Sequence, residues 1–362
     1  MPLGPTLVET IARARADLRM GVPVVLVSGS GGVAVLAAEG LRQDRLEALR
    51  TVGPLVLAIT ARRAETLKAR AYDGDLARIA VDADADEAWV MATADPASDL
   101  SSPMKGPFTT LRDGNAEAHR TALQLVKSAR LLPAALVCDL ADAAGFATAN
   151  GLTALPRDLL KDTLTHLSPL HDIVSGRVPT SVAEQGRVHV FRPEDGGEEH
   201  FAVEIGRVDR TAPALVRLHS ACFTGDVLGS LKCDCGPQLH AALTAMGQAG
   251  SGVLLYLNQE GRGIGLANKM RAYSLQDQGF DTVEANHRLG FEDDERDFRI
   301  GAAILREMGI GTVRLMTNNP AKVQMLESCD VKVVERVPLR VGRNPLNADY
   351  LDAKVAKSGH IP

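Results

Sequence analysis

Short apolar runs alternate with amphipathic segments along most of this chain. In the first half, the runs at 22–27 and 134–140 are typical of buried strands, whereas 116–132 has the apolar spacing of an amphipathic helix. Such alternation predicts a mixed α/β fold. In the second half the same patterns predict strands at 213–219, 252–258, 312–316 and 331–337, and helices at 237–249 and 266–278.

The stretch 171–186 interrupts this pattern with polar and turn-forming residues. We therefore expect a first domain over residues 1–170, a linker over 171–186 and a second domain over 187–362. A chain of 362 residues is long enough to bury two separate cores.

The composition is that of an ordinary globular protein, with 45% hydrophobic and 23% charged residues. The net charge of −5 and the pI of about 6.0 give no basic field, so we expect no nucleic-acid partner. Residues 1–21 carry charges every few positions, which argues against a signal peptide. Since no apolar run approaches the length of about 18 residues that a membrane span needs, we expect a cytoplasmic protein with no membrane partner.

Three of the five cysteines lie within fourteen residues, at Cys222, Cys233 and Cys235. Clustered thiols in a reducing compartment favour a metal over disulfides. If Cys233 and Cys235 lie on an extended segment, they project to the same face, and Cys222 can join them from a turn upstream. Three protein ligands with an open fourth position are typical of catalytic zinc. Two alternatives remain, a closed structural site with His219 as the fourth ligand and a set of buried thiols without metal.

Two further stretches have features that suit phosphate. The first, 258–279, follows an apolar strand, and its glycines allow close backbone approach, although it matches neither a Walker loop nor a dinucleotide fingerprint. In the second, 317–322, Asn319 is a good N-cap and Pro320 suits the first helical position. Lys322 then falls in the first turn, where the helix dipole disfavours a cation unless an anion is bound. The alternative is a solvated lysine.

A charged run at 290–298 is by itself typical of a solvated face. Tyr273 shares a helical stripe with Leu266 and Met270, which by itself indicates a core aromatic residue.

Taken together, the motifs of residues 187–360 resemble GTP cyclohydrolase II of riboflavin biosynthesis. The resemblance implies a zinc-dependent enzyme, and the motifs that carry it are long and stand in the order of the family. They read "CFTGDVLGSLKCDCG", "QEGRGIGLANKMRAYSLQDQGFDTVEANHRLGF", "DERDF", "TNNPAK" and "VERVPLRVGRNP".

The resemblance implies hydrolysis of GTP to 2,5-diamino-6-(5-phosphoribosylamino)pyrimidin-4(3H)-one, with release of formate and pyrophosphate, the first step of riboflavin biosynthesis. It further implies one zinc ion per chain, magnesium with the GTP triphosphate, and a homodimer.

The resemblance also implies roles for individual residues. Cys222, Cys233 and Cys235 occupy the positions of the zinc ligands. Asp294 occupies that of the proton acceptor, Arg296 that of the nucleophile towards the α-phosphate, and Tyr273 that of the tyrosine associated with ring opening at C8. Because a guanidinium is normally protonated, an electrostatic role for Arg296 is an alternative. The GTP-contacting positions are Arg217, Gln238, Glu260, Arg262, Thr282, Thr317 and Lys322.

One position departs from the family pattern. Ala221 stands where the family usually has a glutamate before the first cysteine. Loss of one polar contact costs about 1–3 kcal/mol if nothing replaces it, so we expect weaker or altered GTP binding more than lost chemistry. The alternatives are a catalytically impaired GTP sensor or scaffold, and a cyclohydrolase with a different purine substrate or product.

Residues 8–165 resemble dihydroxybutanone phosphate synthase in "GNAEAHRTALQLVKSARLLPAALVCDL" and "GFATANGLTAL". The acidic loop of that family is missing, and Asn115 replaces its metal-binding histidine. Because a divalent ion needs carboxylate ligands, we expect a degenerate domain without synthase activity, retained for dimer formation or solubility. Gly29, Gly31 and Ala34 fit a dinucleotide fingerprint, but the stretch lacks a helix N-cap, so a plain glycine turn between strands is expected.

Overall fold

The computed structural model describes residues 3–357 and residue 361, and the chain forms two compact units. The first unit comprises Met1–His166 and Ala267–Asp294, and the second comprises Leu167–Leu266 and Glu295–Pro362. Residues 267–294, called the inserted segment below, therefore belong to the second half of the sequence but fold with the first. The hydrophobic pattern of the sequence does not predict that this segment packs with the first unit.

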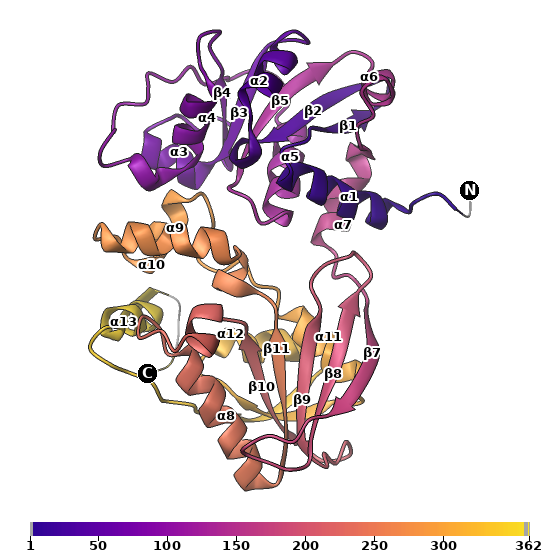
Figure 1. Cartoon of the computed structure of the whole chain (residues 1–362), viewed down its shortest axis with the longest axis vertical. Coiled ribbons are helices and arrows are strands. Elements are labelled where there is room, and N and C mark those ends of the chain that lie inside the picture. The colour runs from indigo at the N-terminus through magenta and orange to yellow at the C-terminus, as the bar shows by residue number, and fades with distance from the viewer. Residues whose placement is uncertain (1–2, 358–360, 362) are drawn as a thin grey trace. The chain divides into compact units, whose positions relative to one another are not determined.

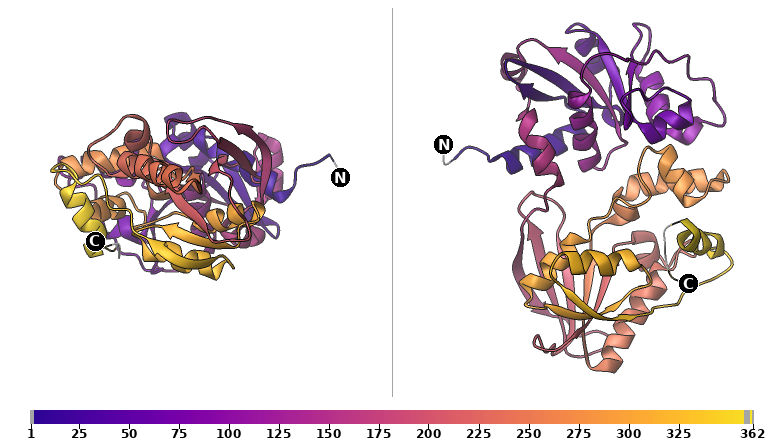
Figure 2. Two further views of the ribbon diagram at one scale, coloured as in Figure 1. Left: turned by 90° about the horizontal axis from the view of Figure 1, so that it is seen from below. Right: turned by 180° about the vertical axis from the view of Figure 1, so that it is seen from behind.

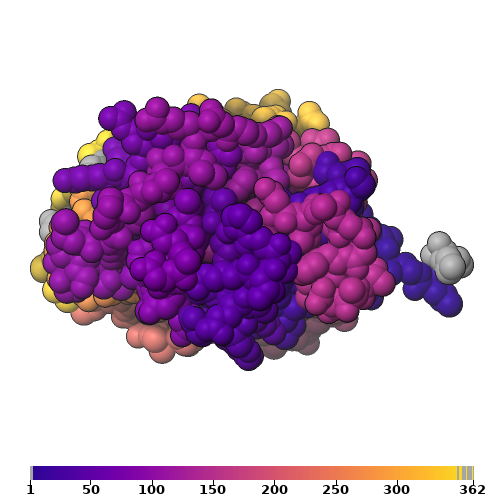
Figure 3. Space-filling model, turned by 90° about the horizontal axis from the view of Figure 1, so that it is seen from above, coloured from indigo at the N-terminus to yellow at the C-terminus, as the bar shows by residue number. Residues whose placement is uncertain are grey.

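The first unit is built on a six-stranded sheet with strand order β4-β3-β5-β2-β1-β6. All its strand pairs are antiparallel except β1 with β6. Figure 3 shows one face of this unit, coloured indigo to magenta. Its elements are α1 (Leu7–Arg19), β1 (Val24–Ser28), β2 (Gly31–Ala37), η1 (Ala38–Gly40), α2 (Gln43–Arg50), β3 (Leu55–Thr60), α3 (Ala61–Leu67), β4 (Leu76–Ala80), α4 (Glu87–Ala94), η2 (Pro96–Ser98), α5 (Glu117–Ser128), β5 (Ala134–Leu140), α6 (Ala143–Asn150), β6 (Ala154–Pro156), α7 (Arg157–Thr165), α9 (Leu266–Asp277) and α10 (Thr282–Arg288).

Helices α1, α5 and α7 bury their apolar stripes against this sheet. Leu18 of α1, Leu125 of α5 and Leu160 of α7 are fully buried in one cluster with Leu26 and Val35 of the sheet. Each such side chain contributes about 1.5–3 kcal/mol when it leaves water. The strands predicted at 22–27 and 134–140 and the helix predicted within 116–132 are confirmed. The glycine stretch forms a plain turn between β1 and β2, which pair antiparallel, as expected.

The second unit contains a seven-stranded sheet with strand order β13-β12-β10-β11-β9-β8-β7. The pairs among β13, β12, β10 and β11 are parallel, and the remaining pairs are antiparallel. Its elements are β7 (Leu170–Arg177), β8 (Gly186–Pro193), β9 (His200–Gly206), β10 (Ala214–Ser220), η3 (Phe223–Val227), α8 (Cys235–Ala249), β11 (Ser251–Leu257), η4 (Glu260–Gly263), α11 (Arg299–Glu307), β12 (Thr312–Met316), α12 (Pro320–Ser328), β13 (Lys332–Val337) and α13 (Ala348–Lys357).

Strand β10 is the point at which this sheet reverses its strand order. The chain passes from β10 through α8 to β11 on one side, and β12 lies on the other side of β10. Helix α8 covers one face through Met246, whereas α11 covers the opposite face through Ile304 (Figures 1 and 2). In open α/β sheets, ligands bind beyond the carboxyl ends of the strands at such a reversal.

The expected fold class, a mixed α/β chain with two compact parts, is confirmed by these two sheets and their helices. All six elements predicted for the second half are present within a few residues of their expected bounds. Within the described residues, every helix is too short or too polar to cross a membrane.

Candidate active site

Most of the predicted site residues lie at the carboxyl ends of the three central parallel strands. Cys222 follows β10, Glu260 follows β11 and Thr317 follows β12. Because these strands run in the same direction, their three loops meet at one edge of the sheet. This is the edge at which the strand order reverses.

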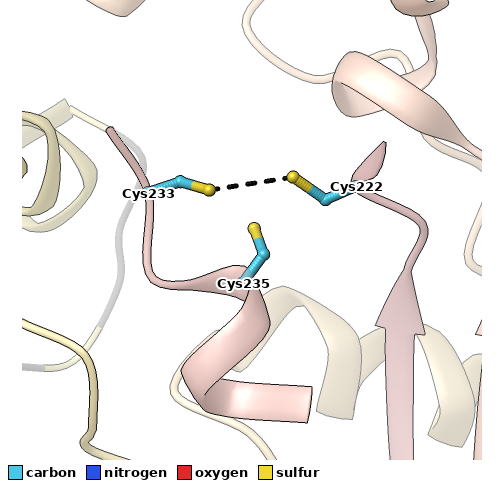
Figure 4. Close-up of side chains that lie close together, drawn as sticks. All are labelled: Cys222, Cys233 and Cys235. Carbon is cyan, nitrogen blue, oxygen red and sulfur yellow. Dashed lines mark hydrogen bonds between the residues drawn. The ribbon is translucent and has the colours of Figure 1, made fainter. Parts of the chain in front are cut away.

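The three cysteine thiols of this edge converge on a common point (Figure 4). The Sγ atoms of Cys222 and Cys233 lie 3.7 Å apart, and all three Sγ atoms, including that of Cys235, lie within 4.8 Å of one another. A tetrahedral zinc ion with bonds of about 2.3 Å to sulfur separates two thiolates by about 3.8 Å. The cluster therefore fits such an ion with little rearrangement.

The thiols converge by a different route from the one that we expected. Cys233 and Cys235 do not lie on an extended segment, because Asp234 has φ −98° and ψ 7° and Cys235 is the first residue of α8. The turn at Asp234, and not strand alternation, brings both thiols to one side. Cys222 closes the set as the N-cap of η3, since its Sγ accepts a hydrogen bond from the Gly225 amide at 3.3 Å.

The chemistry of the donor set also suits a cation. Hydrogen bonding among the thiols and their burial raise the pKa values of Cys233 and Cys235 above the ordinary value of 9.0. These two thiols therefore resist ionisation by themselves, whereas a coordinated metal ion deprotonates its thiol ligands. Among the described residues, this is the one cluster of three or more potential metal ligands.

Asp226 anchors the loop that carries the first cysteine. Its buried carboxylate accepts hydrogen bonds from the Cys222 amide at 3.0 Å, from His219 Nε2 at 3.0 Å and from the Tyr256 hydroxyl at 3.0 Å. Burial lowers the pKa of His219, and burial together with Asp226 raises that of Tyr256. His219 is thus engaged with a carboxylate and is not part of the metal cluster, so the alternative of a closed site with His219 is not supported.

A second polar network adjoins Cys235. Arg217 donates to the Met316 carbonyl at 3.0 Å and to Gln238 Oε1, and Gln238 in turn donates to the Asp234 carboxylate at 2.5 Å. Burial lowers the pKa of Arg217 to about 10. Of the predicted GTP-contacting residues, Arg217 and Gln238 are therefore brought together on β10 and α8.

The loop after β11 is tied to the cysteine loop through Glu260. One oxygen of the Glu260 carboxylate accepts from the Phe223 amide at 2.6 Å, and the other accepts from the Gly261 amide at 2.9 Å. Arg262 has a left-handed backbone, with φ 60°, and its guanidinium lies 6.0 Å from the Tyr350 ring. Ala221, the departure from the family pattern, is held by its amide, which donates to the Leu257 carbonyl at 2.7 Å.

The predicted start of helix α12 is confirmed. Asn319 caps it by accepting from the Ala321 amide at 2.9 Å, and Pro320 is its first residue. Thr317 is buried and accepts from the Asn319 amide at 3.0 Å. The alternative of a solvated Lys322 is wrong, because this side chain is buried and its Nζ donates to the Leu218 carbonyl at 2.8 Å.

Arg296 lies in the second unit, at the same edge of the sheet. Its Nη1 donates to Ser220 Oγ at 3.4 Å, and its guanidinium carbon lies 4.9 Å from the centre of the Phe298 ring. Lys322 Nζ lies over the same ring, also at 4.9 Å. Two of the predicted cationic site residues therefore share one aromatic neighbour.

Tyr273, Thr282 and Asp294 belong to the inserted segment and hence to the first unit. Thr282 begins α10 and its Oγ1 accepts from Gln276 at 3.1 Å, while Asp294 is exposed. The interpretation of Tyr273 as a core aromatic residue is wrong. Its stripe on α9 is not buried, since Leu266 is 39% and Met270 is 40% exposed.

Sequence reasoning did not find the roles of Asp226 and Tyr256. Asp226 lies inside the cysteine motif, so its position beside clustered thiols could have indicated a role at this site. Tyr256 carries no such signal, because only the pairing of β10 with β11 brings it beside His219, with their rings 5.6 Å apart.

The fold and this edge define an α/β protein with a thiol cluster compatible with a metal site. The family model described as GTP cyclohydrolase II matches residues 171–338. A protein named GTP cyclohydrolase-2 from Azospirillum brasilense is 42% identical over 372 aligned positions, which cover 100% of this chain and 96% of that protein. A protein of the same name from Salmonella typhimurium is 52% identical over 192 positions, covering 53% of this chain and 97% of its own length.

Among solved structures, a protein described as RibBX, a two domain 3,4-dihydroxy-2-butanone 4-phosphate synthase from A. baumannii, aligns with 90% of this chain and 98% of its own, at 19% identity and a TM-score of 0.31. The match to the Azospirillum protein extends over the whole chain. This chain therefore belongs to the GTP cyclohydrolase II family, as its motifs predicted.

Proposed function

We propose that this chain hydrolyses GTP to 2,5-diamino-6-(5-phosphoribosylamino)pyrimidin-4(3H)-one and releases formate and pyrophosphate, as the first step of riboflavin biosynthesis. The observation that carries the proposal is the convergence of three thiols at the edge where a partly parallel sheet reverses its strand order. Membership of the GTP cyclohydrolase II family supports it.

Cys222, Cys233 and Cys235 would hold a zinc ion. Bound there, zinc would supply a Lewis acid. Three thiolates would donate electron density strongly to the metal ion. The site therefore needs a separate group that accepts a proton from the attacking water. We assign this role to Asp294, whose carboxylate is exposed, and we assign ring opening at C8 to Tyr273.

The charges of this edge suit a departing pyrophosphate. Arg262 and Lys322 would offset its negative charge, together with magnesium on the triphosphate. Arg217, Gln238, Glu260, Thr282 and Thr317 are assigned as further GTP contacts.

For Arg296 we favour electrostatic stabilisation of the α-phosphate over nucleophilic attack. Its guanidinium lies over the Phe298 ring at 4.9 Å, and the negative face of an aromatic ring favours the charged form of a cation. A charged guanidinium has no lone pair to donate to phosphorus.

For the rest of the chain, we propose that the first half has no synthase activity and that the protein is a homodimer. Asn115, at the position of the synthase histidine, accepts from the Glu117 amide at 2.7 Å and so helps to start α5. This local role accounts for an asparagine here without any metal.

The proposed function is tested by incubating the purified protein with GTP and magnesium and measuring formate and pyrophosphate together. We expect both products in equal amounts. Pyrophosphate without formate would indicate a cyclohydrolase that stops at an earlier product, and GTP that is bound but intact would indicate a sensor. Either result would contradict the proposal.

A further inference from the structure

A turn close to the C-terminus packs against the stretch of chain that carries two of the three clustered thiols. This turn, residues 339–347, is called the C-terminal turn below. It follows β13 and leads into α13, which Figure 1 draws in yellow. The turn belongs to the second unit, as do Cys222, Cys233 and Cys235, so its contacts with the thiol cluster lie within one compact unit.

The first residue of the turn is fixed to the core of the second unit. Leu339 is buried in a cluster with Met246 of α8 and Leu254 of β11. Its amide donates to Asn318 Oδ1 at 3.0 Å, and its carbonyl accepts from Asn318 Nδ2 at 2.6 Å. Because both backbone polar groups of Leu339 are paired with one side chain, the turn leaves the core at a defined place.

Gly342 brings the turn into contact with the thiol-bearing stretch. It has φ +85°, and an added Cβ would lie 2.8 Å from Pro237 Cβ and 3.3 Å from Asp234 Cβ. Asp234 stands between Cys233 and Cys235 and forms the bend that brings their thiols to one side. Glycine allows the close approach of two backbones, and this approach limits how far the bend can move.

Asn344 adds a directed contact on the other side of the first of these thiols. Its Nδ2 donates at 3.2 Å to the carbonyl of Leu231, which stands two residues before Cys233. The Leu231 side chain is 58% exposed, and the loop between η3 and α8 lies outside helices and strands. Burial therefore does little to fix this loop, and the hydrogen bond from Asn344 is one of the contacts that hold it.

Asn347 holds the C-terminal turn in the shape that these contacts require. Its side chain is fully buried. Its Oδ1 accepts from the Asn344 amide at 2.8 Å, and its Nδ2 donates to the Gly342 carbonyl at 2.8 Å. One buried amide group thus joins the two residues that touch the thiol-bearing stretch. Removal of this group would leave both backbone groups unsatisfied, which is costly in a buried place.

We propose that Asn344 and Asn347 are positioning residues for the thiol cluster. They hold the C-terminal turn against residues 231–237, so that Cys233 and Cys235 are placed for a metal ion before it binds. This inference rests on the metal site of the proposed function. Neither asparagine is one of the three thiol ligands, and both act through the backbone that carries those ligands.

The test measures the zinc affinity of the full-length protein by titration against a competing chelator. The absorption spectrum of the Co²⁺-loaded protein reports the thiolate ligation directly. The variants are Asn347→Leu, which keeps the size of the side chain, and Asn344→Ala. The matched control is Leu346→Ala, because Leu346 lies in the same turn and its side chain is 70% exposed. Urea unfolding without metal separates a local effect from loss of the fold.

We expect zinc affinity to fall by about tenfold or more in both test variants, since groups that support metal ligands commonly have effects of this size. The Co²⁺ spectrum should change in both, Asn344→Ala should unfold at the wild-type urea concentration, and the control should match wild type throughout. Wild-type affinity with a wild-type spectrum in either test variant would overturn the inference, as would an equal loss of affinity in Leu346→Ala.

The same experiment separates this inference from the proposed function. A wild-type protein that binds zinc but releases no formate would contradict the proposed function, while the comparison of zinc affinities would still decide the role of the two asparagines. A wild-type protein that binds no zinc would overturn both.

Discussion

At the scale of single residues, Gly225 shows how tightly the candidate metal site is built. A Cβ atom added to Gly225 would lie 2.8 Å from the Cys233 Sγ and 3.1 Å from the Cys222 Sγ. Both distances are shorter than ordinary van der Waals contact, so any side chain here must displace the thiols.

Gly225→Ala is therefore expected to cost about tenfold or more in zinc affinity, without unfolding the chain. The measurement is a zinc titration against a competing chelator, with circular dichroism to monitor the fold. Gly311→Ala is the matched control, because a Cβ added to Gly311 meets no atom within 4 Å. Equal zinc affinities for the two variants would contradict the geometry described here.

Residue types alone predicted part of this site. The three cysteines and the Asn319 cap follow from composition and helix chemistry, and the structure brings the thiols together. The turn at Asp234 could not be predicted, because the sequence does not distinguish it from the extended segment that we expected. Nor does the position of Lys322 in the first turn of α12 show that its side chain reaches the Leu218 carbonyl of strand β10.

At the scale of elements, Asp99 joins several helices of the first unit. Its carboxylate pairs with the fully buried Arg63 of α3 and with Lys105, and Arg288 of α10 lies 3.7 Å away. Burial by itself would raise the pKa of Asp99, but the hydrogen bonds from Arg63 and Lys105 outweigh it and lower the pKa from 3.8.

A folded-state pKa below that of the unfolded chain means that this carboxylate stabilises the fold above about pH 4 and loses that contribution as the pH falls further. Asp99→Asn should therefore lower the free energy of unfolding by about 3–5 kcal/mol at pH 7, and the difference should shrink below pH 4. Urea unfolding at both pH values measures it. The control Asp158→Asn, in an exposed pair with Arg157, should change it by less than about 1 kcal/mol. A difference for Asp99→Asn that does not depend on pH would contradict this account.

The elements themselves were largely predictable. Apolar runs such as 134–140 and 312–316 coincide with β5 and β12 because most of the residues in each strand are buried. The order of the strands was not predictable in the same way. Only the pairing of β10 with both β11 and β12 reveals the edge at which the site residues meet.

At the scale of the whole molecule, the chain is not two consecutive halves. The contact between Arg271 and Glu39 spans 232 positions of sequence, and that between Gly290 and Thr60 spans 230. Local hydrophobic patterns carry no information about contacts between residues that are so far apart in the sequence. The packing of the inserted segment with the first unit could therefore not be predicted from them.

The most direct test of the account is the metal content and product release of the wild-type protein beside Cys233→Ser, with Cys329→Ser as a control outside the cluster. We predict about one zinc ion per chain and release of both formate and pyrophosphate for the wild-type and control proteins, and loss of the metal and of both products for Cys233→Ser. Undiminished turnover of GTP by Cys233→Ser, or a wild-type protein that is active without bound metal, would contradict it.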